Sequence, residues 1–148
     1  MLFRSPVDGR LPDSLRYDPR LRLGPIEMPQ VVAAGYRLNG FRGELFVARY
    51  ENKASAEGAL RDVILSVDID RPLGPEGTPG VYGRSETIGP LSAAVRGRYL
   101  VLLTGPPERR EHLAMMRRVW TRIDALPEEV PAEETKEQED WLKRLFGS

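Results

Sequence analysis

The longest regular pattern of apolar and polar positions in the chain lies within residues 91–126. Residues 99–103 are an apolar run between Arg-Gly-Arg and Thr-Gly-Pro-Pro. A run of this length with turn signals on both sides is typical of a buried strand. Because Gly97 suits a tight turn, we expect residues 91–95 to pair with this run as a hairpin.

A second pattern follows directly, with apolar residues at steps of three and four. It includes Leu113, Met116, Val119, Trp120, Ile123 and Leu126. At about 100° per residue these side chains share one face, and Pro107 and Glu108 are suited to a helix start. Residues 108–126 are therefore predicted to form an amphipathic helix of about five turns that covers one side of a sheet.

Earlier in the chain the patterns indicate further strands. Residues 31–38 and 45–50 are joined through Asn39-Gly40, a strong hairpin signal. Residues 61–70 alternate between apolar and other side chains and are predicted to be a strand with one buried side. Residues 55–60 could form a helical turn, and the glycine-rich residues 73–90 are interpreted as a long loop that acts as a mobile cover or binds a ligand.

The two ends of the chain differ from this middle part. Residues 1–30 contain five prolines spaced four to seven apart, which predicts an extended arm without a helix or an inner strand. Residues 127–148 are an acidic linker followed by a short helix with an apolar patch, formed by Trp141, Leu142, Leu145 and Phe146. The predicted fold is α+β: an antiparallel sheet of about five strands in residues 31–126, packed under one long helix, with the arm and the short C-terminal helix added.

Composition limits the chemistry and the compartment. The chain has 148 residues, enough for one domain, and no cysteine, which excludes disulfides, thiolate metal sites and thiol nucleophiles. The apolar runs are too short for a membrane span and no signal-peptide pattern occurs, so we expect a cytoplasmic protein. Net charge is zero, but residues 1–126 carry 19 basic and 15 acidic side chains, whereas residues 127–148 carry 3 and 7.

The basic excess suggests a candidate anion- or nucleic-acid-binding face on the hairpin and the long helix, with the acidic segment as a competitor. It consists of Arg96, Arg98, Arg110, Arg117, Arg118 and Arg122. Arginine contacts phosphate in a bidentate manner, but a row of arginines on a helix is also the ordinary composition of a solvated face.

Few residues suggest catalysis. His112 is the only histidine, and its position at the edge of the apolar face favours a packed core residue over a catalytic one. A triad would need a serine or threonine beside it, for which Ser85, Ser92 and Thr104 are candidates. Asp68 and Asp70 share a strand face in this interpretation and could bind Mg²⁺ or Ca²⁺ together with Asp62 or Glu86.

Three functions follow from these patterns. The leading expectation is a non-catalytic interaction or assembly module, which uses its arm and its C-terminal patch to dock onto a larger protein complex or onto its own copies. The alternatives are anion or nucleic-acid binding through the arginine face, and metal-assisted hydrolysis around Asp68 and Asp70. No cofactor, resident metal or membrane contact is expected.

Overall fold

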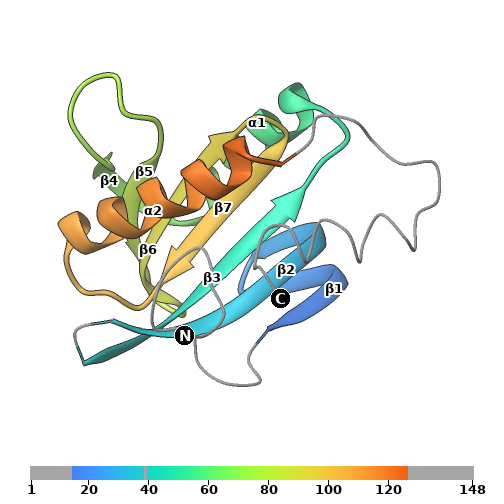
Figure 1. Ribbon diagram of the computed structural model, residues 1–148. Coiled ribbons are helices and arrows are strands. Elements are labelled where there is room, and N and C mark those ends of the chain that lie inside the picture. The colour runs from blue at the N-terminus through green and yellow to red at the C-terminus, as the bar shows by residue number, and fades with distance from the viewer. Residues whose placement is uncertain (1–14, 39, 127–148) are drawn as a thin grey trace.

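The computed structural model describes residues 15–38 and 40–126, apart from the side chains of residues 38 and 68–70. These residues form one antiparallel sheet of seven strands in the order β1-β2-β3-β7-β6-β5-β4, with two helices (Figure 1). The elements are β1 (Arg16–Leu23), β2 (Ile26–Leu38), β3 (Phe41–Arg49), α1 (Lys53–Ser66), β4 (Asp68–Pro72), β5 (Val81–Ser85), β6 (Gly89–Arg96), β7 (Tyr99–Thr104) and α2 (Arg109–Asp124). The α+β class holds, but the prediction of about five strands is wrong.

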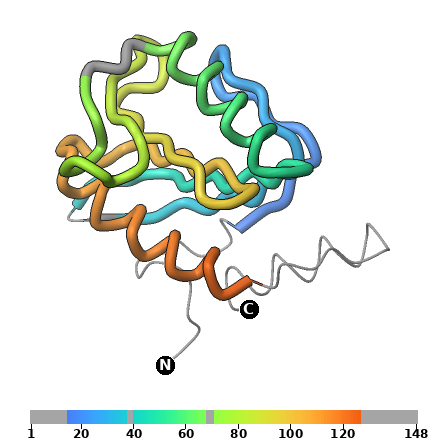
Figure 2. The backbone as a smooth tube through the Cα atoms, turned by 90° about the horizontal axis from the view of Figure 1, so that it is seen from above, coloured from blue at the N-terminus to red at the C-terminus, as the bar shows by residue number. Residues whose placement is uncertain are grey.

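The two helices lie on opposite faces of the sheet. Figure 2 shows the sheet curving partly around α1, while α2 lies against the outer face. Successive side chains of a strand point to opposite faces, and β7 shows this clearly. Its Tyr99, Val101 and Leu103 pack in the core layer with α2, whereas Leu100 and Leu102 pack in the layer with α1. The sheet is therefore buried on both sides, which explains the continuous apolar run of β7.

Both hairpins predicted from turn signals are present. β2 pairs with β3, and β6 pairs with β7 through a turn in which Gly97 has a φ of +61°. The predicted long helix is α2, in which Met116, Val119, Trp120 and Ile123 are buried. These three elements were predictable because each has a local signal that agrees with its tertiary environment.

The extended arm predicted for residues 1–30 is wrong where the structure describes it. Residues 16–23 form β1, and residues 26–30 begin β2. Two of the prolines are tolerated because each lacks a neighbour strand on one side: Pro19 lies on the edge strand β1, and Pro29 lies opposite Arg20 of β1 but before Val31, where pairing with β3 begins. Residues 1–14 lie outside the described residues.

The strand predicted over residues 61–70 is also wrong. Helix α1 continues to Ser66 and only then does β4 begin. The helix starts where the Asn52 side chain accepts a hydrogen bond from the Ser55 N–H at 2.8 Å, a favourable cap. Val63 is buried but Leu65 is 84% exposed, so the apparent two-residue alternation does not correspond to one face.

The stretch 73–90 is only partly a loop. It contains β5 and the first residues of β6, and Tyr82, Gly83 and Ser85 of β5 are buried. The short strand was hidden in the sequence by its glycines and by its length of five residues.

Candidate functional site

The single histidine lies in a buried hydrogen-bond network. Nδ1 of His112 is 2.6 Å from Ser92 Oγ, and Nε2 is 2.7 Å from the Pro106 carbonyl oxygen. Because a carbonyl only accepts, Nε2 carries the proton and the Ser92 hydroxyl donates to Nδ1. Burial lowers the pKa of His112 from 6.5 to about 4, so the imidazole is neutral near pH 7.

Ser92 and His112 have the mutual contact of a nucleophile and its base, but solvent and substrates have no access to them. A triad requires a carboxylate that orients the histidine, and here the Pro106 carbonyl occupies that position. Ser92 and His112 are both 0% exposed, so a substrate cannot reach the hydroxyl. Of the other candidates, Ser85 hydrogen-bonds within the β5–β6 turn, and Thr104 ends β7. The network fixes the β7–α2 connection against β6.

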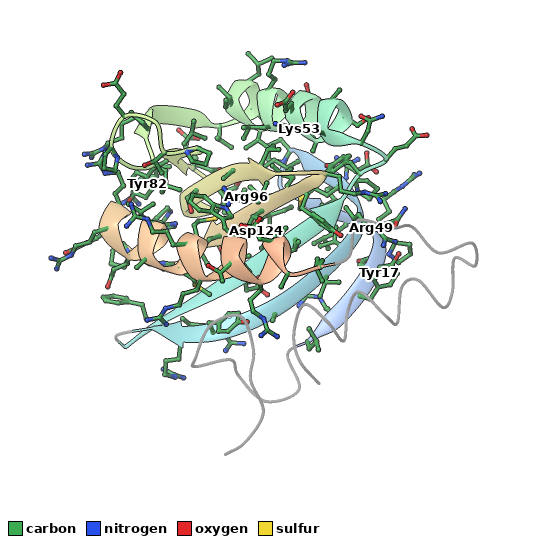
Figure 3. All side chains as sticks on the ribbon, turned by 45° about the horizontal axis from the view of Figure 1, so that its top comes forward. Tyr17, Arg49, Lys53, Tyr82, Arg96 and Asp124 are labelled. Carbon is green, nitrogen blue, oxygen red and sulfur yellow. The ribbon has the colours of Figure 1, made fainter. Side chains whose placement is uncertain are left out.

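Most of the arginines predicted to form an anion site already have partners. Two nitrogens of Arg96 donate to the Asp124 carboxylate at 2.9 and 2.6 Å, and Figure 3 shows both side chains between the hairpin and α2. The hydrogen bond from Arg96 lowers the pKa of the Asp124 carboxyl. Arg98 Nε donates to the Tyr50 carbonyl at 2.6 Å.

The remaining members are spread along α2. Arg110 is paired with Glu108 at 2.7 Å, and Arg122 is also engaged with a neighbour. Only Arg117 and Arg118 are exposed without such a contact among the described residues. Arg110 and Asp124 are 14 residues apart on the helix, about 21 Å at 1.5 Å per residue. The structure therefore does not bring the six arginines together.

Two other predicted sites cannot be placed. The side chains of Asp68 and Asp70 lie outside the described residues, as do Trp141, Leu142, Leu145 and Phe146. Asp62 lies on α1 and Glu86 in the β5–β6 turn, both exposed. Within the part of the chain that the structure describes, no group of three histidine or carboxylate side chains could hold a metal ion.

One open site in the described part of the chain is a groove between α1 and the β1–β2 turn, here named the α1 groove. Its volume is about 420 Å³, within the range of small-ligand pockets. It is lined by Pro25, Ile26, Glu27, Tyr50, Ala59, Asp62, Val63, Leu65, Ser66 and Leu100.

The α1 groove has an apolar floor and an apolar edge. Ile26, Val63 and Leu100 are at most 5% exposed. Leu65, by contrast, is 84% exposed and stands at the edge of the groove. Among the described side chains only Leu65 and Phe41 are large, apolar and exposed. A single exposed leucine is ordinary on a protein surface, but Leu65 lines the same groove as this apolar floor.

Two polar groups of the α1 groove have no partner among the described residues. The Tyr50 hydroxyl oxygen is buried and makes no hydrogen bond within residues 15–38 and 40–126. Burial, with a smaller contribution from the nearby Asp62 carboxylate, raises the pKa of Tyr50 to about 12, so the phenol stays protonated. Asp62 forms no ion pair with another residue that the structure describes, whereas Glu27 lies 3.7 Å from Arg20 and 3.8 Å from Arg22. Tyr50 and Asp62 together could bind a hydrogen-bond donor or a cation.

Two further recesses lie close by. One, of about 520 Å³, shares Pro25 and Ser66 with the α1 groove and extends towards the β5–β6 turn. The other, of about 450 Å³, is named the hairpin pocket; it lies beside the β6–β7 turn and includes Lys53, Arg98 and Leu126. The linings of the two sites contain consecutive residues, because Tyr50 lines the α1 groove and Glu51 lines the hairpin pocket.

Sequence reasoning missed the α1 groove because it treated residues 61–70 as a strand. A helical wheel over residues 53–66 would have placed Leu65 away from Val63 and Ala56, the two buried residues of α1. Asn52 followed by small and charged residues was the available signal for a helix start.

Comparison with known proteins adds no assignment. The chain matches no protein-family model, no curated protein and no solved structure. In residues 15–38 and 40–126, neither helix is long and apolar enough to cross a membrane.

Proposed function

We propose that this protein is a non-catalytic interaction module that binds an apolar, positively charged protein segment in the α1 groove. The observation that carries the proposal is the combination, in one groove, of the exposed Leu65 with a buried tyrosine hydroxyl that lacks a hydrogen bond. Leu65 and the floor favour an apolar side chain. Tyr50 and Asp62 favour a donor or a cation beside it.

The energies agree with this assignment. Covering an exposed leucine contributes about 1.5–3 kcal/mol, a large share of what one interface residue supplies. A buried hydroxyl without a partner costs about 1–3 kcal/mol, and a partner donor or acceptor would recover part of it. A cation near Asp62 adds specificity more than affinity, because Asp62 is exposed.

The other two functions have less support. Four of the six candidate arginines already have partners, which leaves too few for a phosphate-binding surface. Metal-assisted hydrolysis would rely on Asp68 and Asp70, whose side chains lie outside the described residues. A chain without cysteine is compatible with the cytoplasmic location that we also propose.

The proposal can be tested with a displayed library of random twelve-residue peptides. The target is the open-groove variant, a full chain with Trp141→Ala and Phe146→Ala, so that its own apolar anchors cannot compete. We expect enriched peptides to combine leucine or aromatic anchors with lysine or arginine. Their affinity should fall at least tenfold with Leu65→Asp, because the substitution removes an apolar contact and places a carboxylate that is costly to desolvate against the apolar anchors.

The matched control is Ala114→Asp, the same charge placed on the exposed side of α2. This variant should bind the selected peptides as the open-groove variant does. If no peptide family is enriched, or if both aspartate variants reduce binding equally, the α1 groove is not a binding site and the proposal is wrong.

A further inference from the structure

We infer that the occupant of the α1 groove is the chain's own segment 140–146, which binds in cis and excludes other partners until it is displaced. This inference rests on the function proposed above and names the ligand of the same groove. It is argued from two observations, the route of the chain and the chemistry of the segment, and from the general advantage of binding in cis over binding in trans.

The route is short. Leu126 lines the hairpin pocket together with Glu51 and Asn52, and Tyr50 lines the α1 groove. The end of α2 and the start of α1 therefore meet at one corner, although the helices cover opposite faces. Fourteen residues separate Leu126 from Trp141, and fully extended they span about 46–50 Å. Helix α1 is only about 21 Å long, so the whole α1 groove lies within reach.

The segment has the chemistry that the α1 groove lacks. Trp141, Leu142, Leu145 and Phe146 supply four apolar anchors, and Lys143 and Arg144 lie between them. The anchors match the apolar floor and the edge formed by Leu65. A cation from the middle of the segment can bind Asp62, and a donor or a backbone carbonyl can satisfy the Tyr50 hydroxyl.

Binding in cis is favoured by concentration. Residues 127–140 tether the segment 140–146 to the domain, and a short tether gives its end an effective concentration in the millimolar range. A second copy of the chain would need to be present at a similar concentration to compete. The α1 groove is consequently closed by its own segment at ordinary protein concentrations, and a partner must displace it.

The absence of cysteine gives a direct test. Ser66 lies at the end of α1 and is exposed beside the groove, so a full chain with Ser66→Cys and Ser148→Cys contains two unique thiols. A short bis-maleimide should link them within one molecule, as measured by mass spectrometry and denaturing gels at micromolar protein. The control pair is Arg117→Cys with Ser148→Cys, because Arg117 is exposed on α2 across the sheet. We expect the Ser66 pair to react at least tenfold faster than the control pair.

Adding the two substitutions of the open-groove variant should reduce the rate for the Ser66 pair to that of the control. Equal rates for the two pairs would overturn the inference. Links found only between two molecules would also overturn it, since the occupant would then be a second copy. If cross-linking fails while peptide selection still depends on Leu65, the inference falls and the proposed function stands. If both fail, neither stands.

Discussion

The two faces of the sheet differ in how completely their helices cover them. Helix α2 buries six side chains against the outer face: His112, Met115, Met116, Val119, Trp120 and Ile123. Helix α1, on the curved inner face, buries only Ala56 and Val63. The outer face is a closed core layer, and the inner face keeps a groove of about 420 Å³.

The physical reason for this difference is side-chain size. Helix α1 carries small residues at positions 54, 56, 58 and 59, where the sequence reads alanine or glycine. Small side chains cannot fill the space between a helix and a curved sheet, whereas the methionines and tryptophan of α2 do. Of these four residues Ala59 lines the α1 groove, where its small side chain leaves space that a larger one would fill.

The largest expected effect compares equivalent truncations on the two helices. Met116 is 0% exposed, so Met116→Ala should lower the free energy of unfolding by about 3 kcal/mol through lost burial and a cavity. Leu65→Ala, in the open-groove variant, should change it by less than about 0.5 kcal/mol. Urea unfolding followed by circular dichroism measures both. Equal losses would mean that the two faces are equally packed.

A smaller effect is the pH dependence of stability that comes from His112, on the face of the sheet covered by α2. The pKa of His112 is about 4 in the folded protein and 6.5 in the unfolded chain. Below pH 6.5 the unfolded chain therefore binds a proton that the folded protein does not, and stability falls as pH falls. We expect a loss of about 2 kcal/mol between pH 6.5 and pH 5.

His112→Asn is the control for this measurement, because an amide does not titrate. It should be less stable than the wild type at pH 7, yet show a flatter dependence on pH between 6.5 and 5. An unchanged slope in this variant would assign the pH dependence to other groups.

The smallest expected effect is a change in stability that has opposite signs for the removal of two tyrosine hydroxyls. In the open-groove variant, Tyr50→Phe removes a buried hydroxyl that has no hydrogen bond, so stability should rise by about 1 kcal/mol. Tyr82→Phe removes a hydroxyl that donates to the Pro107 carbonyl at 3.1 Å, so stability should fall by about 1 kcal/mol. Thermal unfolding of both variants against their parents tests the comparison. A loss at Tyr50 would show that its hydroxyl does have a partner.

Sequence reasoning succeeded for one face of the molecule and failed for the other. Helix α2 and the β6–β7 hairpin were predictable, because Gly97 and the apolar stripe of α2 are local signals that the tertiary structure supports. Helix α1 was not, because Val63, Leu65 and Val67 imitate a strand, and only packing shows that Leu65 faces away from the core.

The prediction of an extended arm for the proline-rich residues 1–30 was wrong for a related reason. Pro19 and Pro29 do argue against an inner strand, but the rule depends on which neighbours a strand has, and a sequence does not reveal its neighbours. The α1 groove was unpredictable for the same reason, since its lining comes from segments as distant as Pro25 and Leu100.

The pairing of β3 with β7 has a consequence for how the chain is made. Glu44 of β3 lies opposite Thr104 of β7, sixty residues later. Until the ribosome has released β7, the first three strands expose a free hydrogen-bonding edge, which is where unfinished chains associate. Pairing between strands so far apart in the sequence is slow. The yield of folded protein should therefore depend on how quickly β7 pairs with β3.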